Sequence, residues 1–126
     1  MKKILLTLTI LFGIIVHTGA ELSQSELNKL TSQQRQIYLN QLKELNQKLK
    51  QLDRDIFKAE DMIKIGQEMQ REPDGSAKQS GAVYIMRGME LKEKATREIR
   101  ETQNALVLLD RAVREAIINN ERNKKK

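Results

Sequence analysis

The stretch "REPDGSAKQSG" at residues 71–81 separates two long runs of helix-forming residues. It holds the only proline of the chain and two of its six glycines. Pro73 cannot continue a helix, so the first helix must end near Arg71. About five residues then remain before the second run, and connections this short join antiparallel neighbours. The stretch therefore predicts the corner of a two-helix hairpin.

Apolar and small residues recur in alternating steps of four and three on both sides of this corner. In the first run they are Tyr38, Leu42, Leu45, Leu49, Leu52, Ile56, Ala59, Ile63 and Gly66. In the second run they are Ile85, Gly88, Ala95, Ile99, Thr102, Leu106, Leu109, Val113 and Ala116, interrupted at Lys92. This is the period of a coiled coil. We predict an all-α antiparallel hairpin, with helix one at about residues 24–71, the corner at about 72–76 and helix two at about 77–121.

Three capping-box patterns mark the expected helix starts. They are "SQSE" at residues 23–26, "TSQQ" at 31–34 and "SAKQ" at 76–79. In such a box the first side chain accepts a hydrogen bond from a backbone amide that has no partner within the helix. Helix one is expected to begin at one of the first two boxes, and helix two at the third.

Pairing the two runs around the corner predicts which residues meet. The expected pairs are Leu52 with Ile99, Leu45 with Leu106, Leu42 with Leu109 and Tyr38 with Val113. Closer to the corner, Gly66 should face Ile85 and Gly88 should face Ile63. Because a glycine inside a helix costs about 1 kcal/mol relative to alanine, two glycines at matching positions indicate close packing.

Further apolar residues gather around the corner end, outside the seam between the helices. They are Phe57, Met62, Ile65, Met69, Tyr84, Met86, Met89 and Leu91. Two long helices bury only one stripe each, so a second contact is expected. One interpretation is a homodimer that forms a four-helix bundle. The other is a partner-binding patch, since methionine-rich surfaces adapt to varied partners.

The chain opens with "MKK", an apolar run at residues 4–16 and the small residues Thr18, Gly19 and Ala20. This order is typical of a secretory signal peptide. We expect residues 1–20 to be removed and the mature chain to lie in the periplasm, at the cell surface or outside a bacterium. The alternative is an uncleaved anchor, although a 13-residue helix reaches only roughly 20 Å across a hydrocarbon core of about 30 Å.

Composition argues against an enzyme or a cofactor protein. The chain has no cysteine, and its one histidine, His17, lies in the expected signal peptide. The usual ligands of zinc, copper and haem are thus missing, as are Ser/His/Asp and Cys/His catalytic arrangements. We expect no cofactor, no metal and no enzymatic activity. The net charge of +6 falls to +4 without Lys2 and Lys3.

Much of the remaining charge lies in the basic tail at residues 122–126. This tail is expected to be solvated, or to contact an anionic membrane surface weakly. Nucleic-acid binding is not expected, because the chain outside the signal region has only three aromatic residues, Tyr38, Phe57 and Tyr84, and no recognisable binding module.

The sequence "LTSQQ" at residues 30–34 resembles the LTxxQ signature of the Spy and CpxP type periplasmic proteins. The resemblance implies a small exported helical protein that dimerises and acts as a chaperone or as a modulator of stress or metal responses. The matched positions, Leu30, Thr31 and Gln34, would have a structural role. A single motif occurs here, whereas familiar members often carry a second.

These observations together predict an exported, non-enzymatic hairpin that acts by binding another protein or itself. A Spy-like chaperone or stress modulator is the first reading. The alternatives are a self-assembling surface or adhesive coiled coil, and a membrane-anchored stalk of a secretion or envelope complex.

Overall fold

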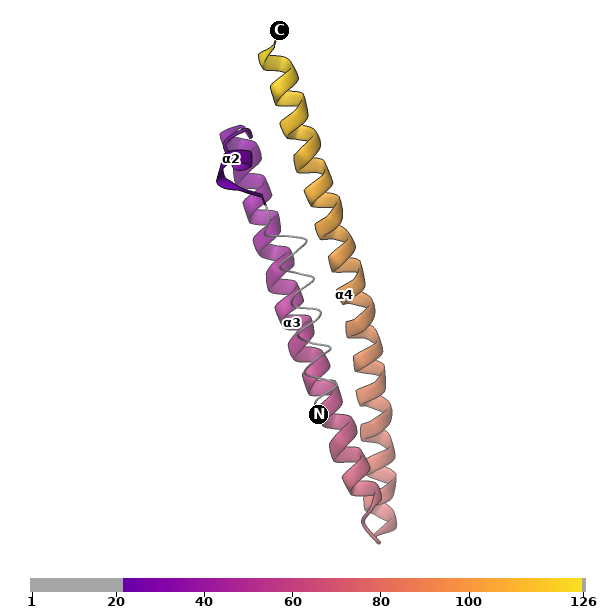
Figure 1. The fold of residues 1–126 in the computed structure, drawn as a ribbon. Coiled ribbons are helices and arrows are strands. Elements are labelled where there is room, and N and C mark those ends of the chain that lie inside the picture. The colour runs from indigo at the N-terminus through magenta and orange to yellow at the C-terminus, as the bar shows by residue number, and fades with distance from the viewer. Residues whose placement is uncertain (1–21, 126) are drawn as a thin grey trace. The chain divides into compact units, whose positions relative to one another are not determined.

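The computed structural model describes residues 22–125, and every regular element in that range is a helix. The helices are α2 (Gln24–Leu27), α3 (Ser32–Gln70) and α4 (Gly75–Lys124). The two long helices pack against each other as a hairpin (Figure 1), which confirms the all-α hairpin predicted from the sequence. The signal peptide predicted at residues 1–20 lies outside the described residues. Within them, no helix is both long and apolar enough to span a bilayer.

The sequence left the start of helix one open between two capping boxes, and both boxes form, so the segment predicted as one helix at about residues 24–71 is divided into α2 and α3. The Ser23 hydroxyl accepts from the Glu26 amide at 3.2 Å. Eight residues later the Thr31 hydroxyl accepts from the Gln34 amide at 3.1 Å, while Gln34 Oε1 accepts from the Thr31 amide at 3.0 Å. A capping residue lies outside helical geometry, so the second box ends the first helix and starts another.

The corner is shorter than predicted, because Asp74 rather than Ser76 caps the second helix. Asp74 Oδ1 accepts from the Ser76 amide at 3.0 Å. The Asp74 carbonyl accepts the first intrahelical bond, from the Lys78 amide, at 3.1 Å. Helix two therefore begins at Gly75 and not at about residue 77. Aspartate and serine cap equally well, and the earlier cap lets the helix gain further backbone hydrogen bonds.

The far end of α4 also exceeds the prediction. The helix continues to Lys124, so the basic tail predicted at residues 122–126 begins inside the last helical turn. Arg122 and Lys124 lie in that turn, where positive side chains interact favourably with the partial negative charge of a helix C-terminus.

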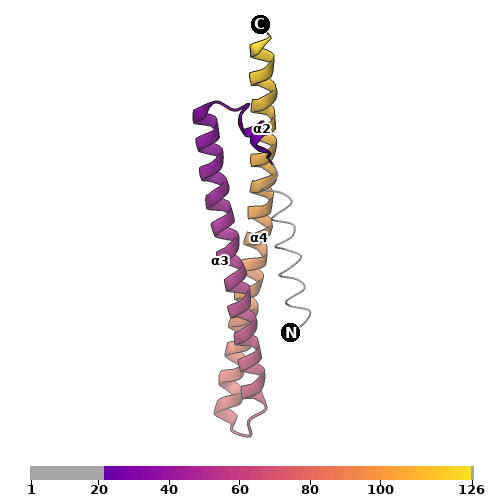
Figure 2. The same cartoon turned by 60° about the vertical axis from the view of Figure 1, so that its left-hand side comes forward.

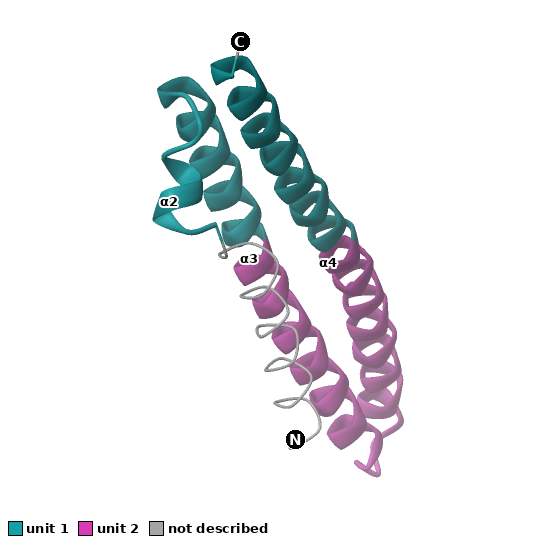
Figure 3. Ribbon diagram, turned by 45° about the horizontal axis from the view of Figure 1, so that its top comes forward, with its two compact units in different colours: residues 1–48, 101–126 teal, residues 49–100 magenta. Residues whose placement is uncertain are grey.

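The chain divides into two compact units (Figure 3). The corner unit comprises residues 49–100, and its seam is buried as the heptad pattern predicts. The buried seam residues are Leu49, Leu52, Ile56, Ala59, Ala95 and Ile99. Both predicted glycine pairs are confirmed: a Cβ added to Gly66 would lie 2.7 Å from Ile85 Cγ1, and one added to Gly88 would lie 2.7 Å from Ile63 Cγ1.

The terminal unit contains the described residues 22–48 and 101–125. The predicted pairs Tyr38 with Val113 and Leu42 with Leu109 belong to one apolar cluster there, in agreement with the seam. The cluster also contains Leu22 and Leu30, from the segment around α2. This segment lies against the C-terminal half of α4 (Figure 2), so it adds a third layer to the two helices of this unit.

Candidate functional site: a groove on the corner unit

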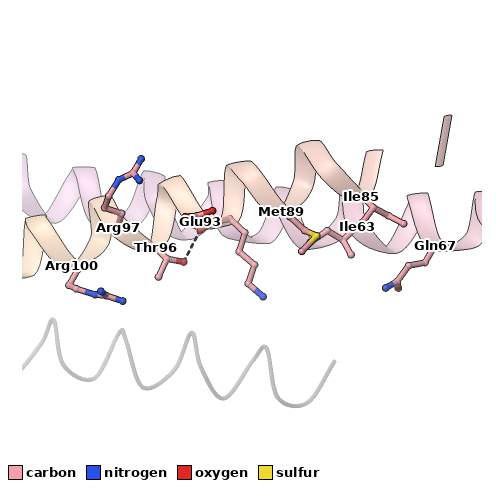
Figure 4. Close-up of a pocket in the computed structure, with 9 residues that line it drawn as sticks. Ile63, Gln67, Ile85, Met89, Glu93, Thr96, Arg97 and Arg100 are labelled. Atoms are coloured by element: carbon pink, nitrogen blue, oxygen red, sulfur yellow. Dashed lines mark hydrogen bonds between the residues drawn. The ribbon is translucent and has the colours of Figure 1, made fainter. Parts of the chain in front are cut away.

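An open groove runs along α4 in the corner unit, on the side where α4 borders α3 (Figure 4). Its lining residues are Ile63, Gln67, Ile85, Met89, Lys92, Glu93, Thr96, Arg97 and Arg100. A second groove continues toward the corner and shares Ile85, Met89 and Glu93 with the first. It adds Met86, Glu90, Ala82 and Gln70. We call the two together the α4 groove.

The two isoleucines in the apolar part of the α4 groove belong to the two glycine pairs of the seam. Ile63 and Ile85 are the large residues that lie opposite Gly88 and Gly66, so the backbones of both helices hold them in place. Met86 and Met89 lie beside them and expose 55 and 59% of their surface. A fixed isoleucine base with mobile thioether side chains beside it suits apolar ligands of varied shape.

The charged part of the α4 groove has two ends of opposite sign. Glu90 and Glu93 lie toward the corner, and Arg97 and Arg100 lie away from it. Lys92, which also lines the groove, already forms an ion pair, because its Nζ lies 3.0 Å from Glu60 Oε1. Its carbonyl accepts from the Thr96 hydroxyl at 2.7 Å. Among residues 22–125, the acids at one end of the groove and the guanidinium groups at the other form no ion pair.

The structure brings together only part of the apolar surface proposed from the sequence. Of the eight residues, Met86 and Met89 line the α4 groove. Outside it, Phe57, Ile65 and Tyr84 are exposed and Met62, Met69 and Leu91 are half-buried. The heptad positions explain the separation: Met62, Met69, Tyr84 and Leu91 occupy g positions, on the opposite flank of the seam from Met89 at an e position.

Sequence reasoning placed Ile63 and Ile85 in the seam and missed their second role as the base of the groove. The available signal was their position opposite glycines. A glycine leaves one side of its partner uncovered, so a large residue facing it reaches the helix border and contributes to the surface there.

The motif residues lie in the other unit and act on its architecture. Leu30 is buried with 4% exposure, and Thr31 and Gln34 form the capping box that starts α3. Gln34 Oε1 also accepts from Asn120 Nδ2 at 2.8 Å, which links the start of α3 to α4. These residues stabilise the reversal of the chain between α2 and α3, and they do not line the α4 groove.

Polar contacts hold the α2 segment in place. Asn120 Nδ2 donates to the Lys29 carbonyl at 3.0 Å, and Arg35 Nε donates to the Leu27 carbonyl at 3.2 Å. Two ion pairs join the segment to α4, Glu26 with Arg114 at 3.1 Å and Lys29 with Glu121 at 3.0 Å. The hydrogen bond from Lys29, followed by its charge, lowers the pKa of the Glu121 carboxyl.

No group of three or more His, Cys, Asp or Glu side chains in residues 22–125 is arranged to hold a metal ion. A scan against family models, a search of curated proteins and a search of solved structures find no match to this chain.

Proposed function

We propose that this protein acts by binding other proteins, through the α4 groove of its helical hairpin, and that it catalyses no reaction. The observation that carries the proposal is the exposure of Met86 and Met89 beside the fixed base of Ile63 and Ile85. Helical segments with apolar faces commonly bind in grooves of this kind, and methionines adjust to different ligand side chains.

We further propose that the protein works in the bacterial envelope, as a chaperone or stress modulator. The basic, apolar and small segments at residues 1–20 support export. Mass spectrometry of the mature protein tests this directly. A chain that begins at Glu21 supports export with cleavage. A chain that retains residues 4–16 supports the alternative of an anchored stalk in an envelope complex.

The groove is tested with a client protein that aggregates on heating or on dilution from denaturant. Wild-type protein is expected to suppress light scattering by the client. The double variant M86E/M89E should lose most of this effect, because two carboxylates beside the isoleucines oppose the burial of apolar client surface.

The matched control is V107E/L108E. Val107 and Leu108 lie on the same helix outside the corner unit, and their exposure is similar, at 44 and 60%. This control should suppress aggregation as wild-type protein does. Wild-type protein without effect on the client, or equal losses in both double variants, would contradict the proposed function.

A second candidate function is self-assembly through the faces of the hairpin. The charges along the α4 groove favour self-assembly. Glu90 and Glu93 lie toward the corner and Arg97 and Arg100 lie away from it, so in two antiparallel copies the acids of one would face the bases of the other.

A further inference from the structure

Four exposed charged residues on α4 follow one another in steps of three, four and three. They are Glu90, Glu93, Arg97 and Arg100. This is the spacing of the seam that joins α3 to α4, so the four side chains lie on one face of the helix. The seam joins α4 to α3, whereas this face borders the α4 groove, as the positions of Glu93, Arg97 and Arg100 in Figure 4 show.

None of these four residues forms an ion pair within residues 22–125. Glu93 and Arg97 are four positions apart, a spacing at which a glutamate and an arginine can pair along a helix. The ion pairs of the described chain lie elsewhere: Lys29 with Glu121, Lys92 with Glu60, and Arg114 with both Glu26 and Asp110. Two acids and two bases are therefore available to a partner.

We propose that this face of α4 binds the same face of a second copy of the chain, with the two α4 helices antiparallel. A two-fold axis level with position 95 places Glu93 opposite the partner's Arg97. It also places Glu90 opposite the partner's Arg100, and the symmetry repeats both pairs. Every acid then meets a base, which is the self-complementarity that a two-fold interface requires.

The opposite orientation and other partners fit less well. Parallel α4 helices in register would set each residue against its own copy, acid against acid and base against base. A purely acidic partner would meet Arg97 and Arg100 favourably but Glu90 and Glu93 unfavourably, and a purely basic partner would do the reverse. A second copy in antiparallel orientation satisfies all four groups together.

The dimer would share its surface with the binding of clients. Glu90 and Glu93 line the same groove as Met86 and Met89, so a second copy seated on the charged face also covers these methionines. In this respect the inference rests on the proposed function: the second copy and a client compete for the α4 groove. Exposed ion pairs contribute little energy each and act mainly on orientation and partner choice. Removal of the apolar surface of Met86 and Met89 from water supplies the remaining attraction; in this register the two side chains lie level with the partner's Asn104 and the partner's Glu101.

Charge reversal tests the dimer without any client. In R97E/R100E all four groups are acidic, and in E90R/E93R all four are basic. Sedimentation equilibrium at low salt should show wild-type dimers and a dissociation constant at least about tenfold higher for each variant alone. An equimolar mixture of the two variants should form a heterodimer. Circular dichroism checks that each variant remains helical.

The fourfold exchange E90R/E93R/R97E/R100E sharpens the test. It preserves self-complementarity in the antiparallel orientation, so it should dimerise with itself about as tightly as wild-type protein does. A control, K58E/K64E, makes the same change in net charge as R97E/R100E at two exposed residues of α3. This control should dimerise as wild-type protein does.

Wild-type protein that stays monomeric would overturn the inference. The same holds if R97E/R100E and E90R/E93R, each measured alone, dimerise as tightly as wild-type protein. A mixture that fails to form heterodimers would overturn it as well. These results are separable from the proposed function, because client aggregation is measured independently. A monomeric wild-type protein that still suppresses aggregation removes only the dimer, and a charge-specific dimer without effect on clients removes only the proposed function.

Discussion

Gly66 of α3 and Gly81 of α4 face each other so closely that a Cβ atom on either would lie 2.6 Å from the carbonyl oxygen of the other. Gly88 makes a similar approach, 2.7 Å, to the carbonyl of Ala59. No glycine in the described chain has a positive φ angle, so these residues are needed for their size and not for their backbone freedom. Together they set the distance between the helices beside the α4 groove.

Gly66→Ala should destabilise the hairpin. Alanine favours a helix by about 1 kcal/mol over glycine, but a methyl group here meets backbone that cannot rotate away. We expect a net loss of about 1–3 kcal/mol in the free energy of unfolding, measured by urea denaturation. Gly75→Ala is the control, because a Cβ at Gly75 would meet nothing within 4 Å. A Gly66→Ala protein at least as stable as Gly75→Ala would disprove the close contact.

Asp74→Ala should weaken the corner by about 1 kcal/mol, the usual cost of removing a helix cap. Its carboxylate accepts a hydrogen bond from the backbone amide of Ser76, in the first turn of α4. Ser76→Ala should change stability much less, since Ser76 lies inside the helix. The two variants are compared by thermal or urea unfolding. A larger loss of stability for Ser76→Ala than for Asp74→Ala would indicate that Ser76 caps the helix, as predicted from the sequence.

Leu30→Ala should release the α2 segment from α4. The side chain is buried against an apolar cluster that includes Val113 and Ile117, and truncating a buried leucine costs about 2–5 kcal/mol. Hydrogen exchange of the backbone amides in α2 should therefore accelerate, while amides near the corner keep their protection. Leu39→Ala provides the control, because Leu39 is exposed on α3. Unchanged exchange in the Leu30 variant would show that the polar contacts alone hold the segment.

Stability should fall at alkaline pH because of Tyr38. Burial, and after it the charge of Asp110, raises the pKa of the Tyr38 hydroxyl above its ordinary value of 10.0. The folded state therefore holds this proton more tightly than the unfolded state does. The resulting stabilisation is complete below about pH 10 and is lost as the pH rises through the higher folded pKa.

Comparison of wild-type protein with Tyr38→Phe isolates this contribution, since lysines titrate in the same range in both proteins. Unfolding free energies measured between pH 8 and pH 11 should decline more steeply for wild-type protein. Parallel pH profiles would mean that Tyr38 ionises as freely in the folded protein as in the unfolded chain.

The fold was largely predictable because the repeat of four and three residues is a local property that identifies the buried side of each helix. The glycine pairs followed from the same register. The docking of α2 was not predictable, because it depends on contacts such as Asn120 with Lys29 between residues far apart in the sequence. Nothing local distinguishes a capping box that begins a long helix from one that begins a single turn.

The candidate site was predictable in part. Met86 and Met89 were expected at the surface and line the α4 groove. The other six proposed residues have comparable hydrophobicity, and only their positions around the seam separate them from the groove. The self-complementary charges of Glu90, Glu93, Arg97 and Arg100 became recognisable once the structure showed that all four are exposed and form no ion pairs within the described chain.

The amino-acid sequence alone determined the two long helices, the corner at Pro73 and the residues of the seam, since each follows from backbone chemistry or from spacing along one chain. Tertiary structure decided which cap begins α4, how α2 folds back, and which apolar residues remain open beside the seam. Those outcomes depend on how closely two backbones approach. Distances such as that between Gly66 and Gly81 are set by both helices together, and no single segment encodes them.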